Sequence, residues 1–162
     1  MADTKFPITG GCLCGAVRFE VNEPPTAVGT CHCRNCQRHT GSAFAAVVRV
    51  RKSALRWTKA QPTMFRSSPI MERGYCPDCG STLISAHYET PPWKDYEKGD
   101  IGLAMGVFDD PYPYTPTFHY GIEHKLSWVA NNDGIPGERI DTDEELRAVY
   151  IARNSTTTRP GS

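Results

Sequence analysis

The sequence predicts a mainly β domain of short, antiparallel strands, and three observations support this fold class. Apolar or alternating segments recur along the chain, turns rich in Pro, Gly, Asp and Ser separate them, and clear helical spacing occurs only near the C-terminal end. The 162 residues fit a single domain, which we place at 1–153, followed by a polar tail over 154–162 that we expect to be disordered.

The expected strands follow one another in chain order. Val17, Phe19 and Val21 alternate with charged residues and predict a half-buried strand over 15–21. The Val-rich run 43–50 predicts a buried strand. Further strands are expected at 64–66, 70–75, 82–86 and 101–107.

Between and after these strands, the sequence predicts irregular structure and one short helix. Charged residues and two adjacent prolines indicate a surface loop over 88–100, and three prolines predict an extended segment over 109–117. Thr142 and Glu145 form a capping box ahead of apolar residues at helical spacing, so we expect a short C-terminal helix.

Bulk properties exclude several classes of function. Lys plus Arg equals Asp plus Glu, so the net charge supports neither a nucleic-acid partner nor a membrane surface. No stretch approaches the ~20 apolar residues that cross a bilayer. The first residues lack the apolar run of a secretory signal, and we therefore expect a cytoplasmic protein.

Cysteine is the most informative residue type in this chain. The seven cysteines form three groups, which are Cys12 with Cys14, Cys31 with Cys33 and Cys36, and Cys76 with Cys79. An odd number leaves one thiol unpaired in an oxidising compartment, whereas clustered cysteines in a reducing cytoplasm indicate metal binding or catalysis. A set of disulfides is the alternative that spacing leaves open.

The last group has the pattern of a zinc knuckle. Pro77 follows Cys76 and fixes the backbone φ angle, and Gly80 follows Cys79 and allows the chain to curl around the sulfurs. A knuckle supplies two of the four ligands of a tetrahedral zinc ion. A second pair of ligands must therefore come from elsewhere in the chain.

The first group can supply that pair. In an extended chain Cys12 and Cys14 share one face, and Leu13 points away from it. With Cys76 and Cys79 they would form a closed, four-sulfur site, which is typical of structural zinc. Spacing alone also permits the pair at 76 and 79 to serve the middle group instead.

The middle group then provides a second site. Cys31, Cys33 and Cys36 supply three ligands, and three ligands leave one tetrahedral position free, as catalytic zinc sites require. We therefore expect two zinc ions per chain, one structural and one catalytic. His39 stands three residues after Cys36 and is an alternative fourth ligand that would close this site.

These motifs, in this order and spacing, resemble one known family. The segments 10–15, 31–44 and 76–80 resemble the glutathione-dependent formaldehyde-activating enzyme family, which also includes centromere protein V. Segments 106–111 and 116–119 look like that family's C-terminal half. The resemblance implies a β-tent fold of antiparallel strands and a carbon–sulfur lyase that joins glutathione to formaldehyde as S-(hydroxymethyl)glutathione.

The resemblance also implies the same division of the cysteines. It assigns a structural zinc to the four-cysteine group and a catalytic zinc to the other, with the ligands Cys12, Cys14, Cys76 and Cys79 in the first site and Cys31, Cys33 and Cys36 in the second. His39 is not part of the family's motif, which weighs against the closed second site.

A site of three thiolates and one zinc ion carries one net negative charge and needs positive groups nearby. Arg34, Arg38 and His39 lie within or beside the middle motif, and we expect them to bind substrate carboxylates or the oxygen of the thiol–aldehyde adduct. Arg73 lies near the last motif and is a further candidate.

Three functions compete at this point. The first is a lyase acting on the adduct of a small thiol and a small aldehyde. The second is a zinc-stabilised binding module without catalysis. The third is a thiol redox protein, in which Cys31, Cys33 and Cys36 would form a disulfide reversibly.

Overall fold

The computed structural model describes residues 5–87, 99–130 and 134–139, together with Thr142 and Glu144. In this part of the chain, strands make up most of the regular structure. The strands are β1 (Ile8–Gly11), β2 (Arg18–Val21), β3 (Ala27–Cys31), β4 (Ala45–Arg51), β5 (Leu55–Trp57), β6 (Thr63–Arg66), β7 (Met71–Tyr75), β8 (Thr82–His87), β9 (Asp100–Ala104), β10 (Phe118–Tyr120) and β11 (Gly137–Glu138). The helical elements are α1 (Arg34–Thr40) and the short 3-10 helices η1 (Lys52–Ala54), η2 (Met105–Val107) and η3 (Ile122–His124).

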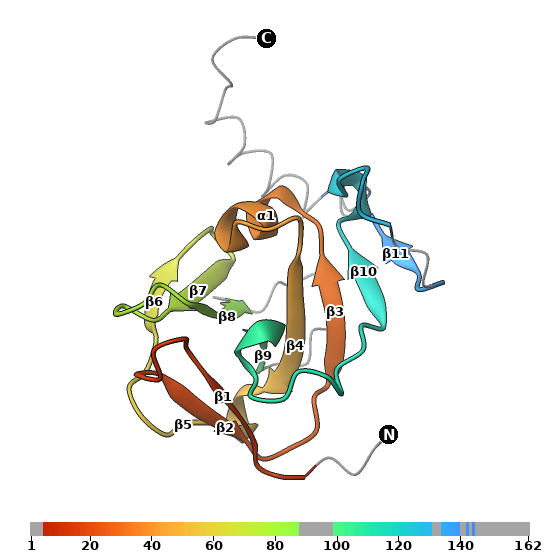
Figure 1. Ribbon diagram of the computed structural model, residues 1–162. Helices are drawn as coiled ribbons and strands as arrows, with labels where there is room; N and C mark the ends of the chain where they lie inside the picture. The colour runs from red at the N-terminus through yellow and green to blue at the C-terminus, as the bar shows by residue number, and fades with distance from the viewer. Residues whose placement is uncertain (1–4, 88–98, 131–133, 140–141, 143, 145–162) are drawn as a thin grey trace.

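The strands form two sheets. The small sheet has the order β1-β2-β5, and the large sheet has the order β11-β10-β3-β4-β9-β8-β7-β6. In Figure 1 the small sheet lies below the large one, and α1 lies at the opposite end of β3 and β4. Most neighbouring strands are antiparallel, so the predicted fold class is confirmed, while the β-tent arrangement that the family resemblance implies stays a prediction.

The large sheet contains one departure from the antiparallel pattern. β10 pairs in parallel with β3 on one side and with β11 on the other. Tyr120 therefore lies opposite Cys31 in the sheet. This pairing brings a segment from the last third of the chain against the middle cysteine group.

The predicted strands differ from the observed ones mainly at their ends. The strand expected over 15–21 begins only at Arg18, because a turn around Gly15, with φ +77°, occupies the first positions. The strand expected over 101–107 ends at Ala104, and η2 follows it. The structure also contains strands that were not predicted, namely β1, β3, β5, β10 and β11, which are short and carry little alternation.

The short cysteine spacing predicts a turn between Cys33 and Cys36, whereas the structure forms the helix α1 from Arg34 to Thr40. Its N-cap is Cys33, whose sulfur accepts a hydrogen bond from the backbone N–H of Cys36, in place of the usual Ser, Thr, Asp or Asn. Its end carries the ordinary signals, which are Arg38 and His39 in the last turn and Gly41 at φ +65°. The predicted C-terminal helix and the tail lie outside the described residues, except for Thr142 and Glu144. The loop predicted over 88–100 also lies outside them, except for Gly99 and Asp100, and Asp100 belongs to β9 rather than to a loop.

The segment 109–117, expected to be extended, carries no strand or helix and contains a turn. The backbone N–H of Tyr114 donates to the carbonyl of Pro111 at 3.1 Å.

The core joins the two sheets. Phe19 of β2 is 1% exposed, and its ring meets those of Phe108 and Trp57 edge-on at centroid distances of 5.3 and 5.9 Å. Val48 and Leu103 from the large sheet are fully buried in the same cluster. Burying a large apolar side chain contributes ~1.5–3 kcal/mol, so these contacts stabilise the frame that carries the cysteines.

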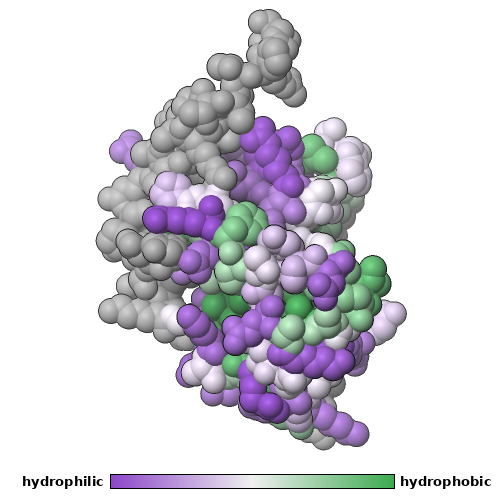
Figure 2. All heavy atoms as spheres, turned by 90° about the vertical axis from the view of Figure 1, so that its left-hand side faces the viewer, coloured by the Kyte–Doolittle hydropathy of each residue, from purple (hydrophilic) through white to green (hydrophobic). Residues whose placement is uncertain are grey.

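The β6 edge of the large sheet is exposed. All four of its residues are solvent-accessible, and Met64 and Phe65 are 40% and 43% exposed. Figure 2 views this side of the domain and shows hydrophobic residues interspersed with hydrophilic ones. No helix among the described residues is long and apolar enough to span a membrane.

Asp109 links β1 and β2 to the segment after η2. Its carboxylate accepts hydrogen bonds from the Thr9 hydroxyl at 2.6 Å and from both terminal nitrogens of Arg18, one of them at 2.9 Å. The hydrogen bond from Arg18 lowers the pKa of Asp109 below its ordinary value, and the Thr9 hydroxyl adds to this effect. The ionised carboxylate therefore stabilises the fold.

We predict that Asp109→Asn lowers the free energy of unfolding by about 1 kcal/mol, a value that allows for the partial exposure of the ion pair. Because the folded pKa lies below the unfolded value, this contribution is present above about pH 4 and is lost as the pH falls through the folded pKa. Thermal denaturation at pH 7 and in acid measures it. Asp110→Asn is the control, since Asn keeps the oxygen that accepts from the Tyr112 N–H; equal effects of the two variants would contradict the prediction.

Candidate metal centres

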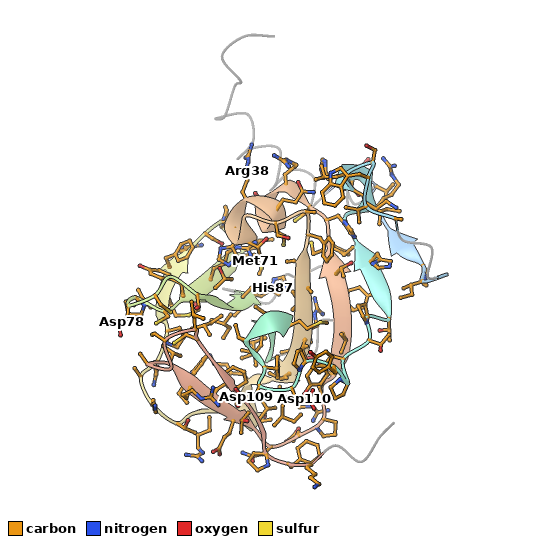
Figure 3. All side chains as sticks on the ribbon, in the orientation of Figure 1. Arg38, Met71, Asp78, His87, Asp109 and Asp110 are labelled. Carbon is orange, nitrogen blue, oxygen red and sulfur yellow. The ribbon has the colours of Figure 1, made fainter. Side chains whose placement is uncertain are left out.

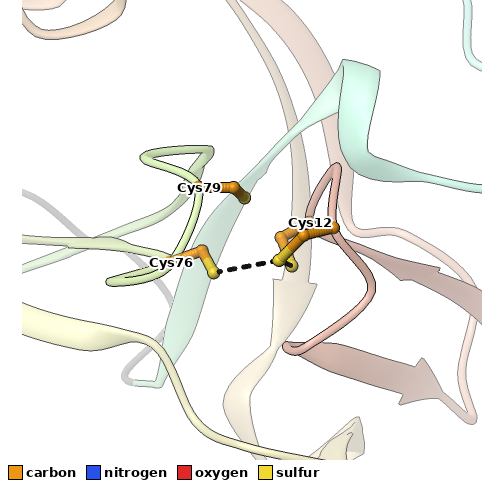
Figure 4. A group of neighbouring side chains, drawn as sticks. Cys12, Cys76 and Cys79 are labelled. Carbon is orange, nitrogen blue, oxygen red and sulfur yellow. Dashed lines mark hydrogen bonds between the residues drawn. The ribbon is translucent and has the colours of Figure 1, made fainter.

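Four cysteine sulfurs converge between the small sheet and the β7–β8 turn. The ligand atoms of Cys12, Cys14, Cys76 and Cys79 all lie within 4.8 Å of one another. Figure 4 shows Cys76 and Cys79 on their turn facing Cys12 across the gap. Cys12 and Cys76 are buried, while Cys14 is exposed, so the cluster lies at the edge of the core.

The spacing of these sulfurs fits a tetrahedral metal ion. Zinc bound to sulfur at about 2.3 Å places neighbouring sulfurs about 3.8 Å apart. The sulfur of Cys14 lies 3.5 Å from that of Cys12 and 3.8 Å from that of Cys76. The four side chains therefore have the donor type, number and separation that a closed zinc site needs.

Tight turns present both pairs of sulfurs. Gly80 takes φ +75° and donates its N–H to the carbonyl of Cys76 at 2.8 Å, as the knuckle pattern predicts. Cys12 and Cys14 lie in a turn rather than in the extended chain we expected, because the N–H of Gly15 donates to the carbonyl of Cys12. Leu13 points away as predicted and is 90% exposed.

Ser81 connects the two turns and was missed by sequence reasoning. Its hydroxyl accepts the backbone N–H of Leu13 at 3.0 Å and lies 3.2 Å from the sulfur of Cys79. Hydrogen bonds from the Ser81 hydroxyl and backbone lower the pKa of Cys79 to about 6. Donors of this kind orient a ligating thiolate and stabilise its charge.

The second cluster lies where β3 runs into α1. Cys31 ends β3, Cys33 is the N-cap of the helix and Cys36 lies in its first turn, and their sulfurs all lie within 4.8 Å of one another. The thiols of Cys31 and Cys33 donate toward Cys36 and, with Arg73 beside it, lower its pKa well below the ordinary value. The described residues contribute no fourth Cys, His, Asp or Glu to this cluster.

Gln37 and Gly121 hold this segment in place. The side-chain amide of Gln37, which is 5% exposed, donates to the carbonyls of His32 at 2.7 Å and His124 at 2.9 Å. Gly121 takes φ +67° directly against Cys33, where a Cβ atom would lie 2.9 Å from the Cys33 nitrogen. These contacts fasten α1 to the segment after β10.

The ring of His32 faces Thr30 and is not grouped with the three sulfurs. The residue is 1% exposed, and its Nε2 lies 3.2 Å from the hydroxyl of Thr30, which is itself 2.6 Å from Nδ1 of His119. Burial lowers the pKa of His32, so its ring is neutral. The histidines at 32 and 119 therefore tie β3 to β10 through Thr30.

The predicted substrate-binding residues lie on two different sides of α1. Arg34 and Arg38 are exposed, Arg34 donates to the side-chain oxygen of Gln37, and Figure 3 shows Arg38 extending outward from the helix. His39 packs toward Phe65, with ring centroids 6.2 Å apart, and burial lowers its pKa. His39 is not grouped with the three sulfurs.

Arg73 contacts the second cluster. Its Nη2 lies 3.9 Å from the sulfur of Cys36, and the residue is 6% exposed. Ile70 and Tyr120 pack around the cysteines and make the surroundings partly apolar. The sequence suggests Arg73 only through its position near the last cysteine motif. It does not predict the contact with Cys36, because nothing in the sequence shows that β7 lies against α1.

The arrangement decides between the pairings that spacing left open. All seven cysteines, each within the described residues, are free thiols, and the pair at 76 and 79 joins the first group and not the middle one. The structure thus has one cluster of four sulfurs and one of three.

The chain is similar to a curated protein and to a solved structure. A curated protein of Schizosaccharomyces pombe described as an uncharacterized lyase is 30% identical over 78 residues, which cover 48% of this chain and 56% of that protein. The chain thus aligns with little more than half the length of this relative. A crystal structure of a Rhodobacter sphaeroides protein is similar with a TM-score of 0.47 and 19% identity, covering 81% of this chain and all of that one.

The match to a family is more extensive. The model of the family described as glutathione-dependent formaldehyde-activating enzyme covers residues 7–123, which include both cysteine clusters, Gln37 and Arg73. The chain belongs to the glutathione-dependent formaldehyde-activating enzyme family.

Proposed function

We propose that this chain is a zinc-dependent carbon–sulfur lyase that joins a small thiol, such as glutathione, to a small aldehyde, such as formaldehyde. The observation that carries the proposal is the three-sulfur cluster, which leaves a tetrahedral ion one position for a substrate. Membership of the family supports the choice of glutathione and formaldehyde. The name of the S. pombe relative supports the reaction class.

The two clusters have different roles in this proposal. Cys12, Cys14, Cys76 and Cys79 hold a structural zinc that joins the N-terminal turn to the β7–β8 turn. The catalytic zinc is held by Cys31, Cys33 and Cys36. Zinc at a site with an open position binds a thiol as the thiolate, which is the nucleophilic form.

The reaction needs no oxidant and no leaving group. The substrate sulfur forms a bond to the aldehyde carbon, the carbonyl π electrons move to oxygen, and the thiol proton leaves the sulfur while the oxygen gains one. The product is an S-hydroxymethyl thioether when the aldehyde is formaldehyde. The partly apolar surroundings formed by Ile70 and Tyr120 limit water around the reacting sulfur.

The exposed cations of α1 have a separate role toward the rest of the substrate. Glutathione carries two carboxylates, and Arg34 and Arg38 lie on the helix that contains Cys36. Guanidinium groups bind carboxylates through paired hydrogen bonds. His39, half-buried beside Phe65, closes the other side of the proposed binding region.

The cysteine chemistry also supports the proposed surroundings of the protein. Seven free thiols, several of them in close groups, require a reducing compartment to remain available for zinc. We therefore assign the protein to the cytoplasm, with a small thiol and a small aldehyde as partners and no nucleic acid.

We predict two zinc ions per chain and different consequences of removing each site. Cys76→Ser removes one zinc and lowers the free energy of unfolding by several kcal/mol, because a structural metal contributes directly to folding. Cys36→Ser also removes one zinc but lowers the free energy of unfolding much less. Metal analysis by mass spectrometry and thermal denaturation measure both effects.

The two variants are matched controls for each other, since each removes one sulfur and adds one hydroxyl. Equal melting temperatures in the two variants would contradict the division into a structural and a catalytic site. A wild-type chain with one zinc and a disulfide among residues 31, 33 and 36 would favour the thiol redox protein.

We predict that the zinc-containing protein accelerates the exchange between glutathione and formaldehyde by at least about tenfold over the uncatalysed reaction. Exchange NMR is the suitable measurement, because this addition also proceeds without an enzyme. Cys36→Ser should leave the exchange at the uncatalysed rate. Wild-type protein with two zinc ions and no acceleration would remove formaldehyde and glutathione as the substrate pair and leave the binding module.

A further inference from the structure

Arg73 is a buried cation whose position none of the roles above explains. It lies in the middle of β7, opposite Phe65 of β6 and Ser85 of β8. The residue is 6% exposed, although a guanidinium is charged at any physiological pH. Burial of a charge is costly unless an opposite charge or several acceptors compensate it.

The contacts of Arg73 identify the compensating group. Its Nε donates to the hydroxyl oxygen of Ser67 at 3.0 Å, and its Nη2 lies 3.9 Å from the sulfur of Cys36. Within residues 5–87, 99–130 and 134–139, no carboxylate forms an ion pair with Arg73. Cys36 is therefore the group in this part of the chain that can supply the opposite charge.

Ser67 holds the guanidinium at Nε, whereas the contact with Cys36 is made by Nη2. The hydroxyl of Ser67 donates to the carbonyl of Met71 at 3.1 Å, and its backbone N–H donates to the same carbonyl at 2.9 Å. The hydroxyl proton is thus engaged, which leaves its oxygen lone pairs for the N–H of Arg73. The turn between β6 and β7 holds the cation at a set distance from Cys36.

We infer that Arg73 is a positioning residue that compensates the charge of the three-cysteine metal site and allows an anionic thiol to bind there. The inference rests on the proposed function, because it assumes a zinc ion at this site. Three thiolates and one Zn²⁺ carry one net negative charge, which Arg73 neutralises. When an anionic fourth ligand binds, the net charge of the site and Arg73 together is −1. Without Arg73 the net charge would be −2.

The basic residues of α1 differ from Arg73 in burial and charge. Arg34 and Arg38 are exposed on α1, where water and salt screen their charge. Burial favours the neutral form of His39. Arg73 lies in partly apolar surroundings close to a sulfur, and charge interactions there are stronger than at the surface.

The test uses cobalt(II) as a spectroscopic substitute for zinc in the full chain. Its absorption bands report the geometry and thiolate ligation of each site, and 2-mercaptoethanol and glutathione are added as probes of the open position. We expect Arg73→Met, which keeps a long side chain without the charge, to weaken thiol binding and second-site metal affinity by about tenfold or more. Arg73→Lys keeps the charge and should retain most of both.

Two further variants control for indirect effects. Arg66→Met removes an exposed arginine from the adjacent strand β6 and should change neither quantity. Ser67→Ala frees the guanidinium while it keeps the charge, and an intermediate loss of thiol affinity is expected. Metal retained in the four-cysteine site shows that the fold of Arg73→Met is intact.

The outcomes separate the two claims. Wild-type protein that binds a second metal but no added thiol would contradict the proposed function. If Arg73→Met binds the added thiol as tightly as the wild-type protein does, only the role of Arg73 is overturned. Equal losses in Arg73→Met and Arg73→Lys, with loss of metal from both sites, would also overturn it, since Arg73 would then be needed for packing alone.

Discussion

Convergence of four cysteine sulfurs from two distant turns is the constraint on which the rest of this structure depends. The β1–β2 turn and the β7–β8 turn are far apart in the sequence, and their four sulfurs lie within 4.8 Å of one another. Without a bound cation, four thiolates so close together would repel one another. Four neutral thiols at this distance would add little to the stability of the fold. The small sheet and the large sheet are joined both by this cluster and by the contacts of Phe19.

The second cluster is held by contacts on three sides, and each of them has a chemical consequence. The parallel pairing of β3 with β10 places Tyr120 opposite Cys31, Gln37 ties α1 to the segment after β10, and β7 carries Arg73 to the sulfur of Cys36. The first two contacts fix the positions of the sulfurs. The third adjusts the charge that the site can accept.

The cysteine clusters could be predicted from the sequence because short spacing between cysteines encodes turns, and turns bring nearby sulfurs together. Sequence reasoning also reached the mainly β class, since apolar periodicity is a local signal. It missed α1, where Cys33 replaces an ordinary N-cap residue, and it treated Cys12 and Cys14 as extended. Ser81, Gln37 and the contact of Arg73 with Cys36 depend on long-range packing, which has no local signature in one sequence.

The central claim is that the three-cysteine site holds a zinc ion whose fourth position accepts a thiol. X-ray absorption at the zinc edge measures it most directly, because it counts the sulfur atoms around zinc. With both sites filled, we expect about 3.5 sulfurs per zinc on average, rising to about 4 when glutathione is added. A value that glutathione does not change would contradict the account.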